Sequence, residues 1–227
     1  MITACFITLN EEENLSKCLN NIKTIVDRIV VVDAYSNDKT IQVAKEFGSE
    51  VYLHKFKDFS SQRNYALSKV KNSWVLMIDP DETCSEKMLK LLPKLAHRKY
   101  DAYKFYWRNY CGDRLVKVVW KVAFFRSFAR YEEEVHERID IPYRHKIYDH
   151  EVYVTHKKNL EEQAEHLKFY RQVILDSYLK GKSKKRIDYL IKDHNKNVTD
   201  WLGKKYNHLL IKNKDLSKLK SAHWNAP

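Results

Sequence analysis

Residues 74–82, with the sequence WVLMIDPDE, join an apolar run directly to three carboxylates. An apolar run of this kind is typical of a buried parallel strand, whose carboxyl end faces the sheet edge where open α/β folds bind ligands. Pro80 fixes its own φ angle and favours an extended conformation at Asp79, so we expect a stiff turn. Asp79 and Asp81 can then converge on one divalent cation, which prefers oxygen ligands.

A helix N-cap is the alternative interpretation of these acids. Glu82 and Ser85 precede apolar residues at helical spacing, namely Met88, Leu91, Leu92 and Leu95. An isolated pair of carboxylates would favour the cap. Three further polar segments upstream favour the ligand site instead.

Strands alternate with helices before this stretch. Apolar, β-branched runs predict strands at 2–9, 29–32, 51–53 and 74–78. Helical patterns lie between them, with Asn10, Ser36 or Asn37, and Ser60 or Ser61 as the expected caps. This alternation predicts an α/β fold with a doubly wound, mostly parallel sheet.

The chain changes character after residue 100. Aromatic and β-branched residues predict strands at 103–107, 116–125 and 152–155, and helical patterns follow from residue 160. We therefore expect a catalytic domain over residues 1–156 and a helical C-terminal extension over residues 157–227. The alternating aromatics favour a strand that buries one face, and one or two rings are expected to reach a substrate.

Each predicted strand ends in polar residues with a chemical use. Thr8 and Asp33 can hydrogen-bond a base or a ribose, and the Arg63 guanidinium can pair with a phosphate. Because parallel strands end at one edge of a sheet, we expect these side chains to share a crevice with Asp79 and Asp81.

Four motifs in order resemble family 2 glycosyltransferases of the GT-A fold. They are TLNEE at 8–12, VVDAYSNDKT at 31–40, QRNYAL at 62–67 and DPDE at 79–82. The chain is most similar to small bacterial enzymes that add sugars to lipopolysaccharide core or capsule. Those enzymes carry a DADE-like motif, and a later HE motif that matches residues 136–137.

The resemblance implies a nucleotide-sugar site, with a UDP-sugar as the expected donor. Asp33 would bind the nucleobase beside Thr8. Asn10 and Glu11 would face the nucleoside, and Arg63 would contact base or diphosphate.

The resemblance also implies a Mn²⁺ or Mg²⁺ ion. Asp81 would be its principal ligand, and Asp79 would contact the ribose or the metal. His156 would be a ligand of the metal or the diphosphate, or else a structural histidine. The Pro in the acidic motif departs from the family pattern without removing a carboxylate.

Inverting transfer needs a base that takes the proton from the acceptor hydroxyl. The matching residue is Glu137, although the family's usual ED-like motif is HE here. Two alternatives stay open: His136 is the base, or Glu137 is a solvated acid of the loop that also holds Glu132, Glu133 and Glu134. The expected acceptor is a glycan or a glycolipid.

The positive charge is concentrated near the C-terminus. From residue 157 onward there are 17 Lys and Arg and 8 Asp and Glu, so this segment carries +9 of the formal net charge of +12. The basic, amphipathic helices are expected to lie on an anionic membrane face, to pack on the catalytic domain, or to pair in a homo-oligomer. The remaining explanation is that the positive charge of this segment only keeps the protein soluble.

Other features bear on location. Four scattered cysteines, no leader sequence and no apolar run long enough to span a bilayer predict a cytoplasmic protein, with the inner face of the cytoplasmic membrane as its expected place of association.

Two other functions fit parts of the sequence but lack their usual motifs. A sugar-nucleotide-forming nucleotidyltransferase usually opens with a Gly-rich loop, whereas the first glycine here is Gly48. A polyanion-binding protein would fit the basic balance, but no nucleic-acid motif accompanies the charge, so we expect no nucleic-acid partner.

Overall fold

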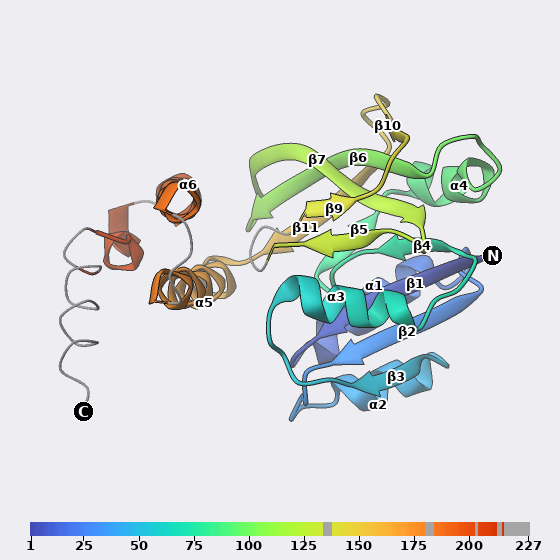
Figure 1. The fold of residues 1–227 in the computed structure, drawn as a ribbon, viewed down its shortest axis with the longest axis horizontal. Coiled ribbons are helices and arrows are strands. Elements are labelled where there is room, and N and C mark those ends of the chain that lie inside the picture. Colours follow the sequence, from blue (N-terminus) through green and yellow to red (C-terminus); the bar gives the residue numbers. More distant parts are fainter. Residues whose placement is uncertain (134–137, 180–183, 203, 213–214, 216–227) are drawn as a thin grey trace. The chain divides into compact units, whose positions relative to one another are not determined.

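The computed structural model describes residues 1–133, 138–179, 184–202, 204–212 and 215 (Figure 1). The chain divides into two compact units. The first holds residues 1–110 and 117–157, and the second holds residues 111–116 and those from 158 onward. The expected division into domains after residue 156 stays a prediction.

Four parallel strands form the first half of the main sheet and confirm the predicted α/β fold. They lie in the order β3-β2-β1-β4 and comprise β1 (Ile2–Thr8), β2 (Arg28–Asp33), β3 (Glu50–Leu53) and β4 (Trp74–Met77). Helices α1 (Glu12–Ile22), α2 (Thr40–Glu46) and α3 (Phe59–Ser68) connect them in turn. Because helices cover both faces, the central strands are apolar on both faces, as at Val30, Val31 and Val32.

The aromatic segments form the second half of the same sheet. β7 (Arg114–Arg126) pairs antiparallel with β4, and the order continues through β6 (Ala102–Cys111), β11 (Tyr153–Lys158) and β5 (Glu82–Cys84). β10 (Arg144–Lys146) adds to β6 in parallel. β8 (Arg130–Glu132) and β9 (Arg138–Asp140) form a separate antiparallel pair.

Several details of this half differ from the predictions. The three-residue strands β5, β8, β9 and β10 were not predicted, because three residues carry no periodic signal, and β8 lies where a polar loop was expected. β11 begins one residue later than expected and runs on to Lys158, so His156 lies inside the strand.

Helix α4 (Glu86–Leu95) decides between the two interpretations of the acidic motif. The Ser85 side chain accepts a hydrogen bond from the Met88 amide and caps this helix. Asp79 and Asp81 therefore do not serve as its cap.

The other three predicted caps were wrong. α1 follows Glu11 and α2 follows Lys39, with no side-chain cap on either helix. α3 is capped by Asp58, which accepts from the Ser61 amide at 2.7 Å. The expected caps Asn10 and Ser36 instead hydrogen-bond across the neighbouring loop.

The sheet separates two hydrophobic cores. Alternate residues of each strand enter one core or the other, as Val31 and Val30 do in β2. One core includes the buried side chains of α1 and α4 together with Trp74 and Phe124. The other lies beneath α3 and includes Leu67.

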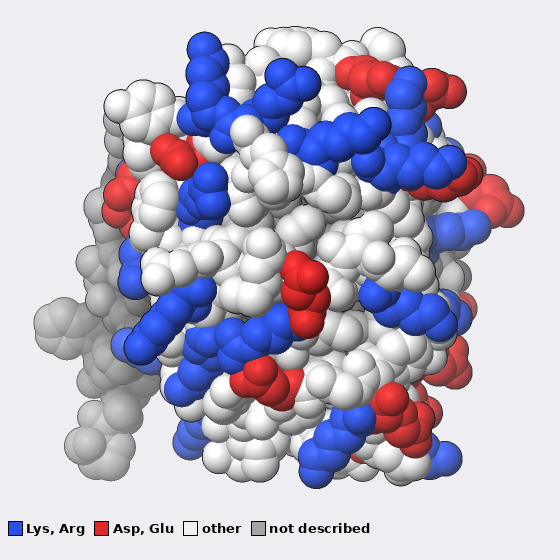
Figure 2. Space-filling model, turned by 90° about the vertical axis from the view of Figure 1, so that its right-hand side faces the viewer, with Lys and Arg blue, Asp and Glu red and all other residues white. Residues whose placement is uncertain are grey.

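Helices form the second unit. α5 (Leu160–Leu179) and α6 (Lys184–Asn197) are followed by a π-helical turn, η1 (Val198–Leu202), and a 3₁₀ turn, η2 (Lys204–Leu209). Within the described part of the chain, no helix combines the length and apolarity needed to cross a bilayer. On the face of the molecule drawn in Figure 2, several Lys and Arg side chains gather near the top, with Asp and Glu side chains beside them.

We predict that Trp74→Ala lowers the free energy of unfolding by about 3–5 kcal/mol. The Trp74 ring stacks on Phe124 with centroids 4.5 Å apart, and its Nε1 donates to the Ala96 carbonyl at 2.8 Å, so truncation leaves both a cavity and an unmatched acceptor. Urea unfolding measures the change. Phe128→Ala is the control, because that ring is 57% exposed. Equal losses in the two variants would contradict the packing described here.

Candidate active site

A buried carboxylate lies at the carboxyl ends of β1 and β2. Thr8 is the register partner of Asp33, and its Oγ1 donates to Asp33 Oδ2 at 2.7 Å. The amide and the hydroxyl of Ser36 each donate to Asp33 at 2.6 Å. These three hydrogen bonds fix the orientation of the Asp33 carboxylate.

The loops after β1 and β2 form one hydrogen-bonded wall. Asn10 adopts a φ of 56°, which its short polar side chain tolerates. Its Oδ1 accepts from the Asn37 amide at 2.9 Å, and its own amide donates to Ser36 Oγ at 2.8 Å. The Glu11 amide donates to Thr40 Oγ1 at 2.7 Å. The predicted residues Asn10 and Glu11 are thus held beside Asp33.

Three consecutive residues of α3 bind three different elements. The Gln62 amide group bonds to the ring and the carbonyl of His54. Arg63 pairs with Asp79, with 2.8 Å between its terminal nitrogen and Oδ1. Asn64 exchanges two hydrogen bonds of 2.8 Å with the backbone of Tyr131 in β8. The QRN motif therefore holds the acidic turn and β8 in fixed positions relative to α3.

The acidic turn after β4 contains a network of buried charges. Lys121 Nζ lies 2.6 Å from both carboxylate oxygens of Glu82 and 3.1 Å from Asp79 Oδ2. Glu82 also accepts from the Asp79 amide at 2.8 Å, which closes the turn. Both oxygens of Asp79 thus bind cationic groups, Arg63 and Lys121.

Burial and neighbouring charges shift the pKa values of these groups in different directions. Burial alone would raise the pKa of Asp79, but Arg63 and Lys121 outweigh it and hold that pKa well below its usual range. Burial raises the pKa of Glu82. Burial would lower the pKa of Lys121, yet the charges of Asp79 and Glu82 hold it above its ordinary value, so the ammonium stays charged.

Lys121 was not among the predicted site residues. The available signal was a lysine inside the apolar run 116–125, since a charge on a buried strand needs a partner. Its partners are 39 and 42 residues away, so the sequence alone does not identify them.

Asp81 contacts His156, the histidine that the family resemblance placed at the site. Pairing of β5 with β11 sets His156 opposite Glu82, and His156 Nε2 lies 3.2 Å from Asp81 Oδ2. The two side chains are 7% and 9% exposed. The other ring nitrogen, Nδ1, bonds to Asn109 Oδ1 at 3.0 Å, which fixes the plane of the imidazole.

This pair has the chemistry of a metal site. A carboxylate oxygen and an imidazole nitrogen both suit Mn²⁺, and a second hydrogen bond that orients the histidine is typical of metal ligands. Among the described residues, no three His, Cys, Asp or Glu side chains are grouped to hold a metal. Among the described residues, Asp81 and His156 thus have donor atoms suited to a metal, and both oxygens of Asp79 are engaged with Arg63 and Lys121.

The predicted base lies outside the described residues. His136 and Glu137 fall in the segment 134–137, between β8 and β9.

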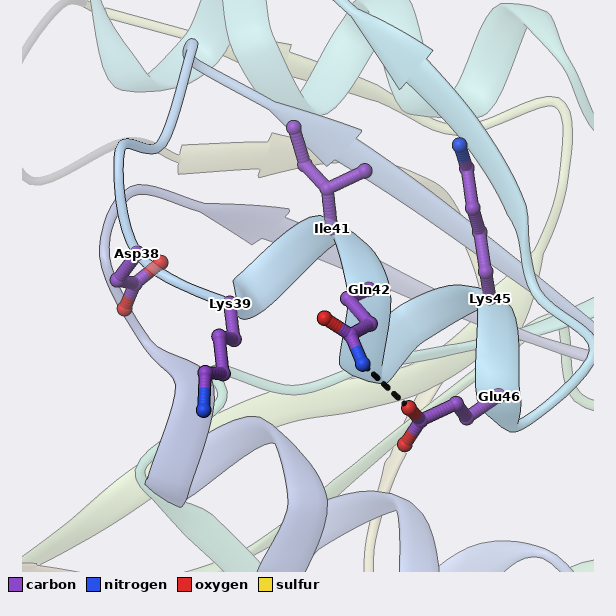
Figure 3. Close-up of a pocket in the computed structure, with 6 residues that line it drawn as sticks. All are labelled: Asp38, Lys39, Ile41, Gln42, Lys45 and Glu46. Carbon is purple, nitrogen blue, oxygen red and sulfur yellow. Dashed lines mark hydrogen bonds between the residues drawn. The ribbon is translucent and has the colours of Figure 1, made fainter.

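A separate pocket lies along α2 and is shown in Figure 3. Its lining residues come from α2 and the residues just before it: Asp38, Lys39, Ile41, Gln42, Lys45 and Glu46. None of the predicted site residues lines it.

Comparison with known proteins identifies the family. A family model described as "Glycosyl transferase family 2" matches residues 3–179. The chain belongs to this family.

Two curated members of glycosyltransferase families are similar over part of the chain. An uncharacterized glycosyltransferase of Rickettsia bellii is 33% identical over 106 residues, which are 46% of this chain and 36% of that protein. The glycosyltransferase SunS of Bacillus subtilis is 35% identical over 98 residues, 42% of this chain and 23% of that protein. The matched part thus spans about a third or less of the length of these relatives.

A solved structure confirms the predicted GT-A fold. S. aureus TarS 1–349, in complex with UDP-GlcNAc, superposes with a TM-score of 0.55 at 14% identity, covering 97% of this chain and 79% of TarS.

We predict that Lys121→Met destabilises this family 2 glycosyltransferase by about 3–5 kcal/mol, because Glu82 would keep a buried charge without its cation. Lys117→Met is the control, because it makes the same change on the same strand but away from Asp79 and Glu82. Urea unfolding of both variants tests this. Losses below about 1 kcal/mol for Lys121→Met would show that Glu82 does not depend on the ion pair.

Proposed function

We propose that this protein transfers a sugar from a nucleotide-sugar donor to a hydroxyl of a glycan or glycolipid acceptor, with inversion and with a divalent cation. One observation carries the proposal: Asp79 and Asp81 follow β4 at the same sheet edge as Asp33, and His156 of β11 lies against Asp81. A metal-ligand pair and a nucleoside-binding carboxylate at one edge are what a nucleotide-sugar site requires.

The donor would lie along this edge. Asp33 and Thr8 would bind the nucleobase, and the wall that contains Asn10 and Glu11 would flank the nucleoside. Arg63 would contact the diphosphate or the base. TarS was solved with UDP-GlcNAc, which supports a UDP-sugar as the first donor to test.

Mn²⁺ or Mg²⁺ would be held by Asp81 and His156, and we keep Asp79 as a contact of the ribose or the metal. When bound, the cation would offset the charge of the leaving diphosphate. Asn109 would keep the His156 ring turned toward Asp81, because it fixes the opposite nitrogen.

Glu137 is proposed as the base that takes the acceptor proton, with His136 as the alternative. The position of the strand before these residues, β8, supports the assignment. Asn64 fixes β8 to α3, and Ser60 donates to the Glu133 carbonyl, so the chain enters this segment from a defined position beside Arg63.

The proposed division into a catalytic domain, 1–156, and a basic helical extension, 157–227, assigns these residues to the first part. The net charge of the extension supports association with anionic lipids at the inner face of the cytoplasmic membrane. A glycolipid acceptor would be presented there, which fits a role in lipopolysaccharide or capsule synthesis. Pairing of the C-terminal helices between subunits is the other role we propose for them.

We predict that UDP raises the melting temperature only when Mn²⁺ is present, because a ligand that binds the native state stabilises it by mass action. Asp81→Asn should abolish the metal-dependent part of that shift while the protein stays folded. GDP, CMP and dTDP are the parallel ligands, and Asp188→Asn, at an exposed residue of α6, is the matched control. A full Mn²⁺-dependent shift in Asp81→Asn would exclude Asp81 as a ligand, and no shift with any nucleotide in the wild type would overturn the proposed function.

We predict that Glu137→Gln retains the nucleotide-induced shift and loses transfer by about 10²–10⁴-fold, the contribution of a positioned base. Transfer is measured as release of the nucleoside diphosphate with acceptor present. Glu13→Gln, an exposed glutamate of α1, controls for the loss of one carboxylate. Transfer by Glu137→Gln within a few-fold of the wild type, with a large loss in His136→Gln, would assign the base to His136.

A further inference from the structure

A stacked group of aromatic rings lies on β6, β7 and the segment after β10. Tyr106 and Trp120 stack with ring centroids 4.3 Å apart, and Trp120 meets Tyr148 edge-on at 5.4 Å. His150 stacks on Tyr106 at 4.9 Å. The Tyr148 side chain is 66% exposed, and Tyr106 and Trp120 are half-buried, so the group borders solvent.

These rings do not belong to the hydrophobic cores. Residues of β6 alternate, so Tyr103, Phe105 and Trp107 point into the core that includes Trp74. Tyr106 points to the opposite face. The two cores beside the sheet, as far as the structure describes them, do not include Tyr106, Trp120, Tyr148 or His150, and neither does the core of the second unit around Leu167 and Trp201. Core packing therefore does not account for this aromatic group.

Two lysines lie beside the rings. Lys104 of β6 and Lys146 of β10 are register partners, so they share one face of the sheet. Lys146 Nζ lies 5.3 Å from the centroid of Trp120. Among the described residues, no carboxylate forms an ion pair with either lysine. The acids just downstream, Asp149 and Glu151, pair with Lys87 instead.

The arrangement of these lysines is electrostatically unfavourable in the free protein. Like charges on directly opposed strand positions destabilise a sheet. Burial, followed by the charges of Arg144 and Lys146, lowers the pKa of Lys104. The Arg144 guanidinium itself donates to the Ile139 and Ile141 carbonyls. A bound anion would remove the cost at Lys104 and Lys146.

We propose that Lys104, Tyr106, Trp120, Lys146 and Tyr148, the aromatic–lysine patch, bind a sugar that carries an anionic group. The sugar ring packs against the exposed Tyr148 ring and the part of Trp120 that Tyr106 leaves uncovered, where the negative potential of the aromatic faces attracts its C–H groups, and the phosphate or carboxylate lies between the two lysines. Tyr106, stacked on both Trp120 and His150, holds these rings in place. The inference rests on the proposed function, because it specifies the acceptor as an anionic glycan.

The test compares glucose 6-phosphate, glucuronic acid and glucose by saturation-transfer NMR on the full chain, with inorganic phosphate, which has no carbon-bound protons, measured as a competitor of glucose 6-phosphate. We expect the two anionic sugars to bind about ten-fold more tightly than glucose, the effect of roughly one charge-assisted hydrogen bond. They should also bind more tightly than phosphate, because only they use the rings as well.

Variants assign the binding to the patch. Lys104→Gln with Lys146→Gln should reduce the affinity for glucose 6-phosphate to that for glucose, and Trp120→Ala should weaken both sugars. Lys117→Gln and Tyr143→Ala, the latter at a ring that is 72% exposed outside the patch, should change neither.

Three outcomes would overturn the proposal: equal binding of glucose and glucose 6-phosphate, unchanged binding in the patch variants, or tighter binding of an oligothymidylate that the same variants abolish. The last would assign the patch to nucleic acid. The Mn²⁺-dependent UDP shift of the wild type, measured in parallel, separates failure of this inference from failure of the proposed function.

Discussion

The buried carboxylate of Glu82 is the constraint on which the site depends. It has no solvent exposure, and Lys121 lies 2.6 Å from both its oxygens. The same carboxylate accepts from the Asp79 amide, and its strand, β5, pairs with the strand of His156. One ion pair therefore fixes the acidic turn, β7 and β11 relative to one another. A buried charge of this kind is costly unless its partner is present, so the arrangement tolerates little displacement.

Local patterns predicted the first half of the fold and part of the site. Strands β1 to β4 are short apolar runs, and their carboxyl ends carry Thr8, Asp33 and the acidic motif, so a parallel sheet brings these residues to one edge. No local pattern pairs Lys121 with Asp79, and His156 was expected near Asp81 only from the resemblance to the family. Lys121 and His156 reach them through antiparallel pairing in the second half of the sheet, and strand register is a non-local property.

The helix caps also show that local sequence patterns do not decide every contact, here between residues close in the structure. Asn10 and Ser36 have the right chemistry for caps, but the neighbouring loop competes for their hydrogen bonds and wins. The aromatic run of β6 shows the opposite case. Its period of two predicted that one face would be buried, and the structure assigns Tyr103, Phe105 and Trp107 to that face. Only the positions of β7 and β10 reveal that the other face gathers rings and lysines as well.

Helix α3 binds the acidic turn through Arg63 and strand β8 through Asn64, two adjacent residues. A chimera that took β8 and the following segment from a relative, but kept its own α3, would have to rebuild both hydrogen bonds of Asn64 against a foreign backbone. Crossover points for exchanging acceptor-side segments between family members therefore belong before α3 and after β8. The span from Asp58 to Glu132 should be exchanged as one block.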